Sequence, residues 1–294
     1  MTRRDFTSLL SLSALTIGMT SLKELYTWGT GLKSTGLTPS LFIGHGSPMN
    51  AIEENDFVKG FREVSKTLGE IQAILVVSAH WLTRGTAVTA MSQPRTIHDF
   101  GGFPQALFEV QYPAPGSPAL AKEIIELIPS KQIHEDHQWG LDHGTWTILK
   151  HMYPEANIPV VQFSIDMRSS LQEHFELAKQ LRLLRSKGVL IIGSGNIVHN
   201  LQAVDFNRIN DIGYGFEWAH ESKAFVNEHI QKRQFNPLLN LETAPIAMKH
   251  AVPTPDHYIP LLYALGQADL KDEIHFFNDQ LLAGSLSMTS IKIG

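Results

Sequence analysis

The chain has 294 residues, of which 43% are hydrophobic and 18% charged, a composition typical of a globular protein with a substantial core. Its net charge of −5, together with the lack of any Lys/Arg cluster, argues against a nucleic-acid partner, because nucleic-acid binders present a basic face. There is no cysteine, which excludes disulfides, thiolate metal sites and a cysteine nucleophile.

Residues 1–35 are predicted to form an N-terminal extension, and residues 36–294 a single folded domain. An Arg-Arg pair at positions 3–4 precedes a mildly apolar stretch at 9–18, which resembles a twin-arginine export signal. That stretch is too short and too rich in Ser and Thr to span a bilayer stably. The alternative is an amphipathic N-terminal helix of a cytoplasmic protein, so both a periplasmic and a cytoplasmic location stay open.

Beyond residue 40, apolar strand-like runs alternate with segments of helical periodicity. Strands are predicted at residues 40–43, 73–77, 158–165, 189–192 and 285–293. Helices are predicted at 51–68, 118–128, 171–186, 217–232 and 255–265. This alternation predicts an α/β protein with a single three-layer α/β/α domain, built on a central mixed and largely parallel sheet. Ligands of such sheets bind beyond the carboxyl ends of the strands.

Three histidines follow these strands. His45 lies between two glycines, His80 follows the most apolar strand, and His199 comes after a predicted glycine turn at 193–195. A fourth, His257, is predicted in the first turn of the 255–265 helix, with Thr254 as the N-cap. Because imidazole is the commonest metal ligand in proteins, the pattern predicts a metal site at one edge of the sheet.

Two further segments carry candidate functional residues. His143 stands beside a carboxylate and a glycine, a context suited to acid/base chemistry or to holding substrate. The segment 96–104 is rich in glycine and aromatic residues and is predicted to be a pocket-lining loop. The remaining histidines are expected on the surface, at positions 134, 137, 151, 174, 220, 229, 250 and 275. The chain has no Gly-x-Ser-x-Gly elbow, Walker loop or His-Glu-x-x-His helix, which argues against the common hydrolase, nucleotide-binding and protease functions.

Several of these segments together resemble a known family. They are Gly-His-Gly-Ser-Pro-Met-Asn at 44–50, Ser-Ala-His-Trp at 78–81, Thr-Ile-His-Asp-Phe-Gly-Gly-Phe-Pro at 96–104, Tyr-Pro-Ala-Pro-Gly-Ser-Pro at 112–118, Asp-His-Gly-Thr-Trp at 142–146, Val-His-Asn at 198–200 and Thr-Pro-Asp-His-Tyr-Ile-Pro-Leu-Leu at 254–262. From residue 39 to residue 294 the chain resembles the class III extradiol ring-cleavage dioxygenases, and most closely the 4,5-DOPA extradiol dioxygenase branch.

The resemblance implies roles for five histidines. His45, His80 and His257 are expected to hold the metal, and His199 is expected to be either a fourth ligand or an acid/base group. His143 corresponds to a histidine that contacts substrate or carries a proton. Extradiol relatives outside this branch commonly have a carboxylate where His257 stands, so an all-histidine set departs from the two-His-one-carboxylate site.

The resemblance also implies one divalent metal per chain. Fe(II) is expected for activity, because ring opening needs a metal that shares electron density with both a catechol and O2, and Zn(II) is an alternative occupant. The expected substrates are O2 and a small catechol such as L-DOPA, with Trp81, Phe103 and Trp146 as candidates for the wall of an aromatic slot. A zinc-dependent hydrolase at the same histidines and a metal-binding protein without activity are the alternatives. The oligomeric state stays open.

Overall fold

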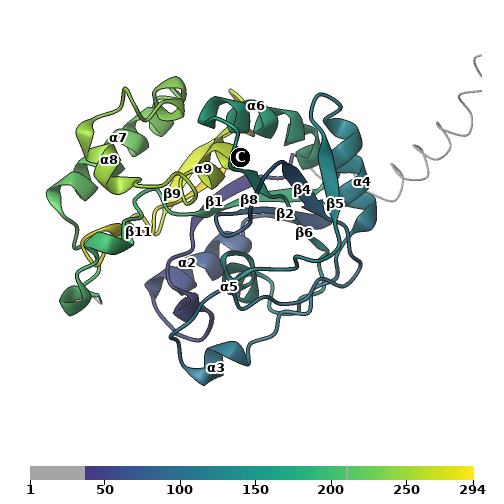
Figure 1. Cartoon of the computed structure of the whole chain (residues 1–294), viewed down its shortest axis with the longest axis horizontal. Coiled ribbons are helices and arrows are strands. Elements are labelled where there is room, and N and C mark those ends of the chain that lie inside the picture. The colour runs from purple at the N-terminus through teal and green to yellow at the C-terminus, as the bar shows by residue number, and fades with distance from the viewer. Residues whose placement is uncertain (1–36, 210) are drawn as a thin grey trace, which may run out of the picture.

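The computed structural model describes residues 37–209 and 211–294. A six-stranded sheet lies at the centre of the described chain (Figure 1), with the strand order β6-β2-β8-β1-β12-β9. These strands are β1 (Ser40–Gly44), β2 (Ala73–Ser78), β6 (Val160–Gln162), β8 (Val189–Gly195), β9 (Ile274–Phe277) and β12 (Ser290–Ile293). The four strands from β6 to β1 are parallel, β12 pairs antiparallel with β1, and β9 pairs antiparallel with β12. The predicted mixed, largely parallel sheet is confirmed.

Helices cover both faces of this sheet, as predicted (Figure 1). They are α2 (Asp56–Ser65), α3 (Gln105–Phe108), α4 (Pro118–Leu127), α5 (His143–Met152), α6 (Leu171–Leu181), α7 (Glu217–Gln231), α8 (Ile246–Ala251) and α9 (Ile259–Leu265). Helices α2 and α5 pack on one face, and α4, α6 and α9 on the other. Helices α7 and α8 pack with α9 over the side of the sheet that carries β12.

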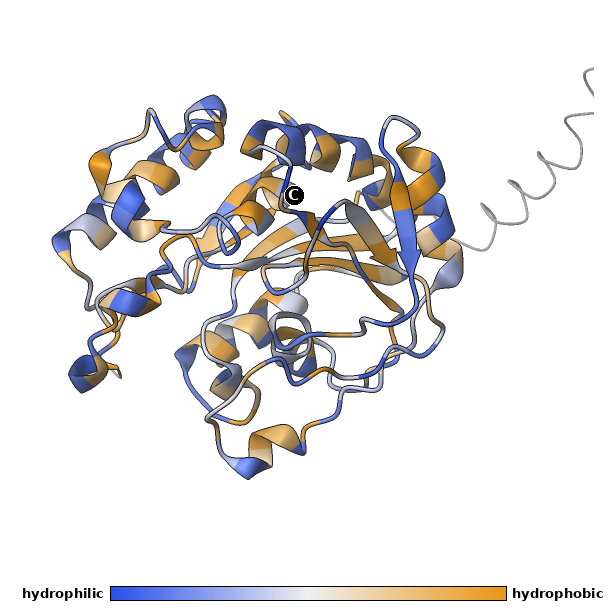
Figure 2. Ribbon diagram, viewed as in Figure 1, coloured by the Kyte–Doolittle hydropathy of each residue, from blue (hydrophilic) through white to orange (hydrophobic). Residues whose placement is uncertain are grey.

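The alternation of side chains along the buried strands explains the three layers. In β2, Ile74 and Val76 contact the α2/α5 layer, whereas Leu75 and Val77 contact the α4/α6/α9 layer. Successive strand residues point to opposite faces, so a strand that is apolar at every position must be covered on both sides. Figure 2 shows the central strands as mostly hydrophobic, and the covering helices as having one hydrophobic and one hydrophilic side.

Two predicted strands are each divided in the structure. The 158–165 run forms β6 and then β7 (Ile165–Asp166), which pairs with β3 (Leu82–Thr83) outside the main sheet. The 285–293 run forms β11 (Leu286–Ser287), paired with β10 (Leu281–Leu282), and then β12. A further pair joins β4 (Thr86–Thr89) to β5 (Ile133–Asp136).

One histidine that was expected on the surface is buried. His174 in α6 has no exposed surface, and its Nδ1 lies 3.0 Å from the Tyr263 hydroxyl of α9. Within the described residues, no helix is long and apolar enough to cross a membrane. The predicted N-terminal extension, including its twin-arginine-like segment, lies outside the residues that the structure describes.

Candidate metal centre

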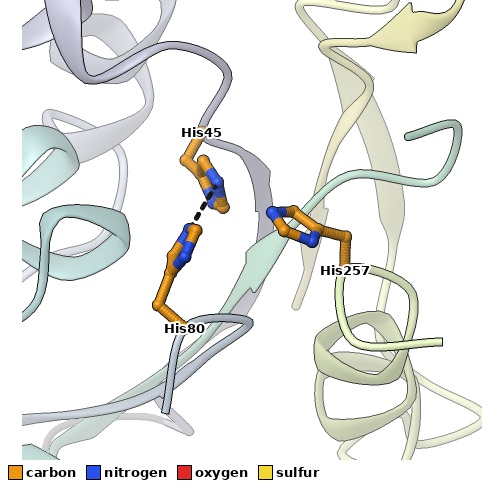
Figure 3. A group of neighbouring side chains, drawn as sticks. All are labelled: His45, His80 and His257. Atoms are coloured by element: carbon orange, nitrogen blue, oxygen red, sulfur yellow. Dashed lines mark hydrogen bonds between the residues drawn. The ribbon is translucent and has the colours of Figure 1, made fainter. Parts of the chain in front are cut away.

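Three of the predicted histidines point toward one another at the carboxyl edge of the sheet (Figure 3). His45 follows β1, His80 follows β2, and His257 lies in the turn before α9. Each offers one ring nitrogen, and these atoms all lie within 4.8 Å of one another. The Nε2 atoms of His45 and His80 are 3.2 Å apart. The adjacency of β1, β8 and β2 brings together residues that are far apart in the sequence.

Hydrogen bonding determines which nitrogen of His45 is free. The Ser194 hydroxyl donates its one hydrogen to the backbone carbonyl of Gly144 at 2.6 Å, because a carbonyl can only accept. At its contact with His45 Nδ1, 2.9 Å away, the same hydroxyl must therefore accept. His45 thus carries its proton on Nδ1 and presents an unprotonated Nε2 to the other two histidines.

The turn that carries His257 differs from the predicted helix start. Helix α9 begins at Ile259, and Thr254 and Pro255 belong to the preceding turn, so the N-cap prediction is wrong. In that turn the backbone N–H groups of Tyr258 and Ile259 donate to the Pro255 carbonyl at 3.0 and 2.9 Å. The Asp256 carboxylate accepts a hydrogen bond from His257 Nδ1, which leaves Nε2 of this histidine free as well.

The site favours neutral imidazoles. Burial lowers the pKa of His45 and of His80 well below the ordinary value, and the neighbouring histidines lower it further. The pKa of Asp256 is below its ordinary value, because the hydrogen bond from His257 outweighs the effect of burial. Neutral imidazole is the form that binds metals.

The histidine beside this cluster has an unexpected carboxylate partner. His143 begins α5, and its Nδ1 lies 3.0 Å from Oδ2 of Asp99, not of the adjacent Asp142. Asp142 is fully buried as the N-cap of α5 and accepts hydrogen bonds from Ser78 Oγ and Gln162 Nε2, both at 2.7 Å. The contact between Asp99 and His143 spans 44 positions, so no local sequence signal marks it.

His199 stands on the other side of the cluster. Its ring stacks on that of His257, with the ring centroids 3.5 Å apart and the planes 6° from parallel. Its ligand atom falls in a group with Asp256 and His257, and not in the group that joins His257 to His45 and His80. Burial, and then the nearby His257, lower the pKa of His199 to about 3. The geometry therefore places His199 against His257 but outside the group of three convergent ligand atoms.

The expected aromatic wall is only partly present. Trp146 is fully buried and donates from Nε1 to the Ile97 carbonyl, and Trp81 is buried and stacked on Trp139. The aromatic ring that contacts the site is Phe100, which meets the His143 ring edge-on at a centroid distance of 5.6 Å. Phe103 packs behind Phe100 at 5.4 Å.

The donor set fits a divalent metal. Two of the three convergent histidines have Nδ1 occupied by a hydrogen-bond acceptor, and this arrangement orients an imidazole to bind a metal through Nε2. Three neutral nitrogen donors suit both zinc and iron, and leave positions for substrate when an ion is bound. The residues present therefore meet the requirements of a mononuclear metal centre.

Comparison with known proteins gives consistent matches. Residues 38–282 match the family described as the catalytic LigB subunit of aromatic ring-opening dioxygenase. The 4,5-DOPA dioxygenase extradiol of Escherichia coli K12 is 44% identical over 268 residues, which cover 90% of this chain and 97% of the relative. The protein of the same name from Beta vulgaris is 35% identical and covers 86% and 95%. The crystal structure of an uncharacterized protein from Escherichia coli K12 superposes with a TM-score of 0.76 at 40% identity, covering 87% of this chain and all of that one.

Proposed function

The chain belongs to the family of the catalytic LigB subunit of aromatic ring-opening dioxygenase, and we propose that it opens a DOPA-like catechol at an Fe(II) ion held by His45, His80 and His257. As a member of this family it is a metal-dependent extradiol dioxygenase, which uses O2 and a small aromatic substrate. The family membership favours this activity over the zinc-hydrolase alternative.

The observation that carries the ligand assignment is the convergence of three imidazoles from separate segments. Their ligand atoms lie within 4.8 Å of one another, and His45 and His257 each have Nδ1 engaged by a neighbouring acceptor. A bound Fe(II) ion would supply the electron density that dioxygen needs, which d10 zinc cannot do. We therefore assign Fe(II) to the active enzyme and Zn(II) to an alternative occupant.

Two histidines next to the cluster are suited to carry protons. Nδ1 of His143 is engaged by Asp99, so Nε2 is the nitrogen that can accept a proton from a catechol hydroxyl. His199 stacks on the His257 ring, with the ring centroids 3.5 Å apart, and its imidazole is thereby placed to exchange a proton with a substrate bound at this centre. We assign the acid/base steps to these two residues and leave His199 out of the ligand set. Both atoms of O2 enter the product, at the two carbons of the ring bond that breaks.

The choice of a DOPA-like catechol rests on the relatives. Two proteins that are 44% and 35% identical to the chain are named 4,5-DOPA dioxygenase extradiol, and both matches span nearly all of the relative. The Phe100 ring beside His143 supplies an aromatic surface for a flat substrate. The proposed substrate is thus a catechol with an amino-acid side chain.

Oxygen uptake tests this proposal. Protein reconstituted with Fe(II) under anaerobic conditions should consume O2 when L-DOPA is added and release a yellow semialdehyde. The same protein loaded with Zn(II) should consume none, because zinc has no accessible redox change. If the Fe(II)-loaded protein consumes O2 with a simple catechol but not with L-DOPA, the substrate assignment is wrong. If the Zn(II)-loaded protein hydrolyses a panel of esters without O2 as fast as the Fe(II)-loaded protein does, the hydrolase alternative is supported instead.

A further inference from the structure

The Asp99 carboxylate contacts His143 at two points. Oδ1 accepts a hydrogen bond from the His143 backbone N–H at 2.8 Å, and Oδ2 lies 3.0 Å from its Nδ1. The Asp99 and His143 side chains are 15% and 7% exposed, so water competes weakly for either contact. Because the backbone contact occupies one oxygen, the other is held facing the imidazole.

This geometry specifies the protonation of His143. An ionised carboxylate only accepts hydrogen bonds, so Nδ1 must carry a proton, and in the neutral ring Nε2 is then the free acceptor. Nδ1 of His80 lies 3.7 Å from the same Oδ2, beyond hydrogen-bond distance, so the carboxylate bonds to His143.

The two residues that precede Asp99, Ile97 and His98, are held in place by hydrogen bonds. The Ile97 N–H donates to the Leu141 carbonyl at 2.7 Å, and the Ile97 carbonyl accepts from Trp146 Nε1 at 2.8 Å. His98 Nε2 lies 3.0 Å from the Val110 carbonyl. Leu141 and Trp146 flank His143 in the sequence, so the segment and the start of α5 are tied together. The carboxylate is therefore positioned before any substrate binds.

We propose that Asp99 is a positioning residue that holds His143 in the Nδ1-protonated tautomer, with Nε2 directed toward the substrate as the proton acceptor. This inference rests on the proposed function, which gives His143 an acid/base role. In this role Asp99 acts through the orientation and tautomer of His143, and not by binding substrate or metal itself. The arrangement follows the general logic by which a buried carboxylate orients a catalytic histidine.

The variant Asp99→Asn tests the proposal because it is nearly isosteric. The amide oxygen still accepts from the His143 N–H, which turns the amide NH2 group toward Nδ1 and requires that nitrogen to become an acceptor. In metal-free, 15N-histidine-labelled protein, His143 should carry its proton on Nδ1 in the wild type and on Nε2 in the variant. In the Fe(II)-loaded enzyme, kcat should fall by about 10²-fold or more, with metal content and KM nearly unchanged.

Three further variants make the outcome decisive. Asp99→Glu keeps a carboxylate and should restore part of the lost kcat, whereas Asp56→Asn, an exposed carboxylate-to-amide change in α2, should leave kcat unaltered. His143→Gln should lose kcat as Asp99→Asn does. If His143→Gln keeps full kcat, the acid/base role in the proposed function is wrong. If His143→Gln loses kcat while Asp99→Asn keeps both kcat and the wild-type tautomer, the positioning role of Asp99 is overturned.

Discussion

His174 is a buried histidine that lies outside the metal centre. It lies between α6 and α9 and contacts the Tyr263 hydroxyl. Burial, and then the nearby positive charge of Lys131, lower the pKa of His174 to about 4. Between about pH 6.5 and pH 4 the unfolded chain binds a proton at this position and the folded chain does not. The stability that the neutral ring contributes is therefore complete above pH 6.5 and is lost as the pH falls toward 4.

Replacing His174 should flatten the acid side of the stability profile. The lowering of the His174 pKa corresponds to at most about 3 kcal/mol in the free energy of unfolding. Urea unfolding in the presence of a metal chelator measures this effect. Between pH 7 and about pH 4.5, the free energy of unfolding should fall less for His174→Gln than for the wild type. The exposed His134→Gln is the matched control and should keep the wild-type slope. Parallel profiles for the wild type and His174→Gln would show that the buried ring does not govern this range.

The sequence identifies histidines more readily than their partners. His45 and His80 could be singled out because each follows an apolar strand that ends in a loop. Asp99 could not be assigned to His143, because hydrogen bonds between loops depend on the folded arrangement and not on spacing. The burial of His174, in contrast, could have been predicted, because it lies three and seven positions before the apolar Leu177 and Leu181 on the buried face of α6.

The end of β8 shows how glycines allow the metal centre to form. The 193–195 segment was predicted as a turn, but it continues the strand. A Cβ atom at Gly195 would lie 2.2 Å from the His257 carbonyl oxygen, and one at Gly193 would lie 2.0 Å from that of Pro260. The turn that carries His257 and the first turn of α9 therefore pack directly on the β8 backbone. The glycines are needed for this close approach.

The variant Gly195→Ala should displace that turn. The added methyl group has no space, so the free energy of unfolding should fall by about 1–3 kcal/mol, and the affinity for metal should fall because His257 moves. Urea unfolding and a metal titration measure the two effects. Gly101→Ala is the control for stability, because a Cβ there meets nothing within 4 Å. If Gly195→Ala unfolds and binds metal as this control does, the close-packing explanation is wrong.

Element boundaries show what periodicity predicts and what it does not. Phe57, Phe61 and Val64 recur at helical spacing within the predicted 51–68 helix, and all three are buried in α2. That helix nevertheless begins only at Asp56, where the Asn55 side chain accepts from the Val58 N–H. The 158–165 run is apolar and strand-like throughout, yet β7 leaves the main sheet to pair with β3. Strand pairing is decided by distant segments, so a continuous apolar run does not reveal the break.

The alternation of strands and helices was sufficient to predict a three-layer α/β domain, but not the order of its strands. β8 lies between β2 and β1, although more than a hundred residues separate it from either strand in the sequence. That order places the carboxyl ends of β1 and β2 on either side of β8, and Ser194 at the end of β8 contacts His45. The pairing of strands that are far apart in the sequence depends on how both faces of the complete sheet are buried. The residues of one strand therefore do not reveal which strands lie beside it.

The metal content of single-histidine variants tests the central claim most directly. The wild type and four variants, His45→Ala, His80→Ala, His257→Ala and the exposed His134→Ala, would be purified anaerobically and titrated with Fe(II). We predict one ion per chain in the wild type and in His134→Ala, and less than about a tenth of that in the other three, because each loses one of three ligands. Retention of full metal content by any of these three would contradict the proposed metal centre.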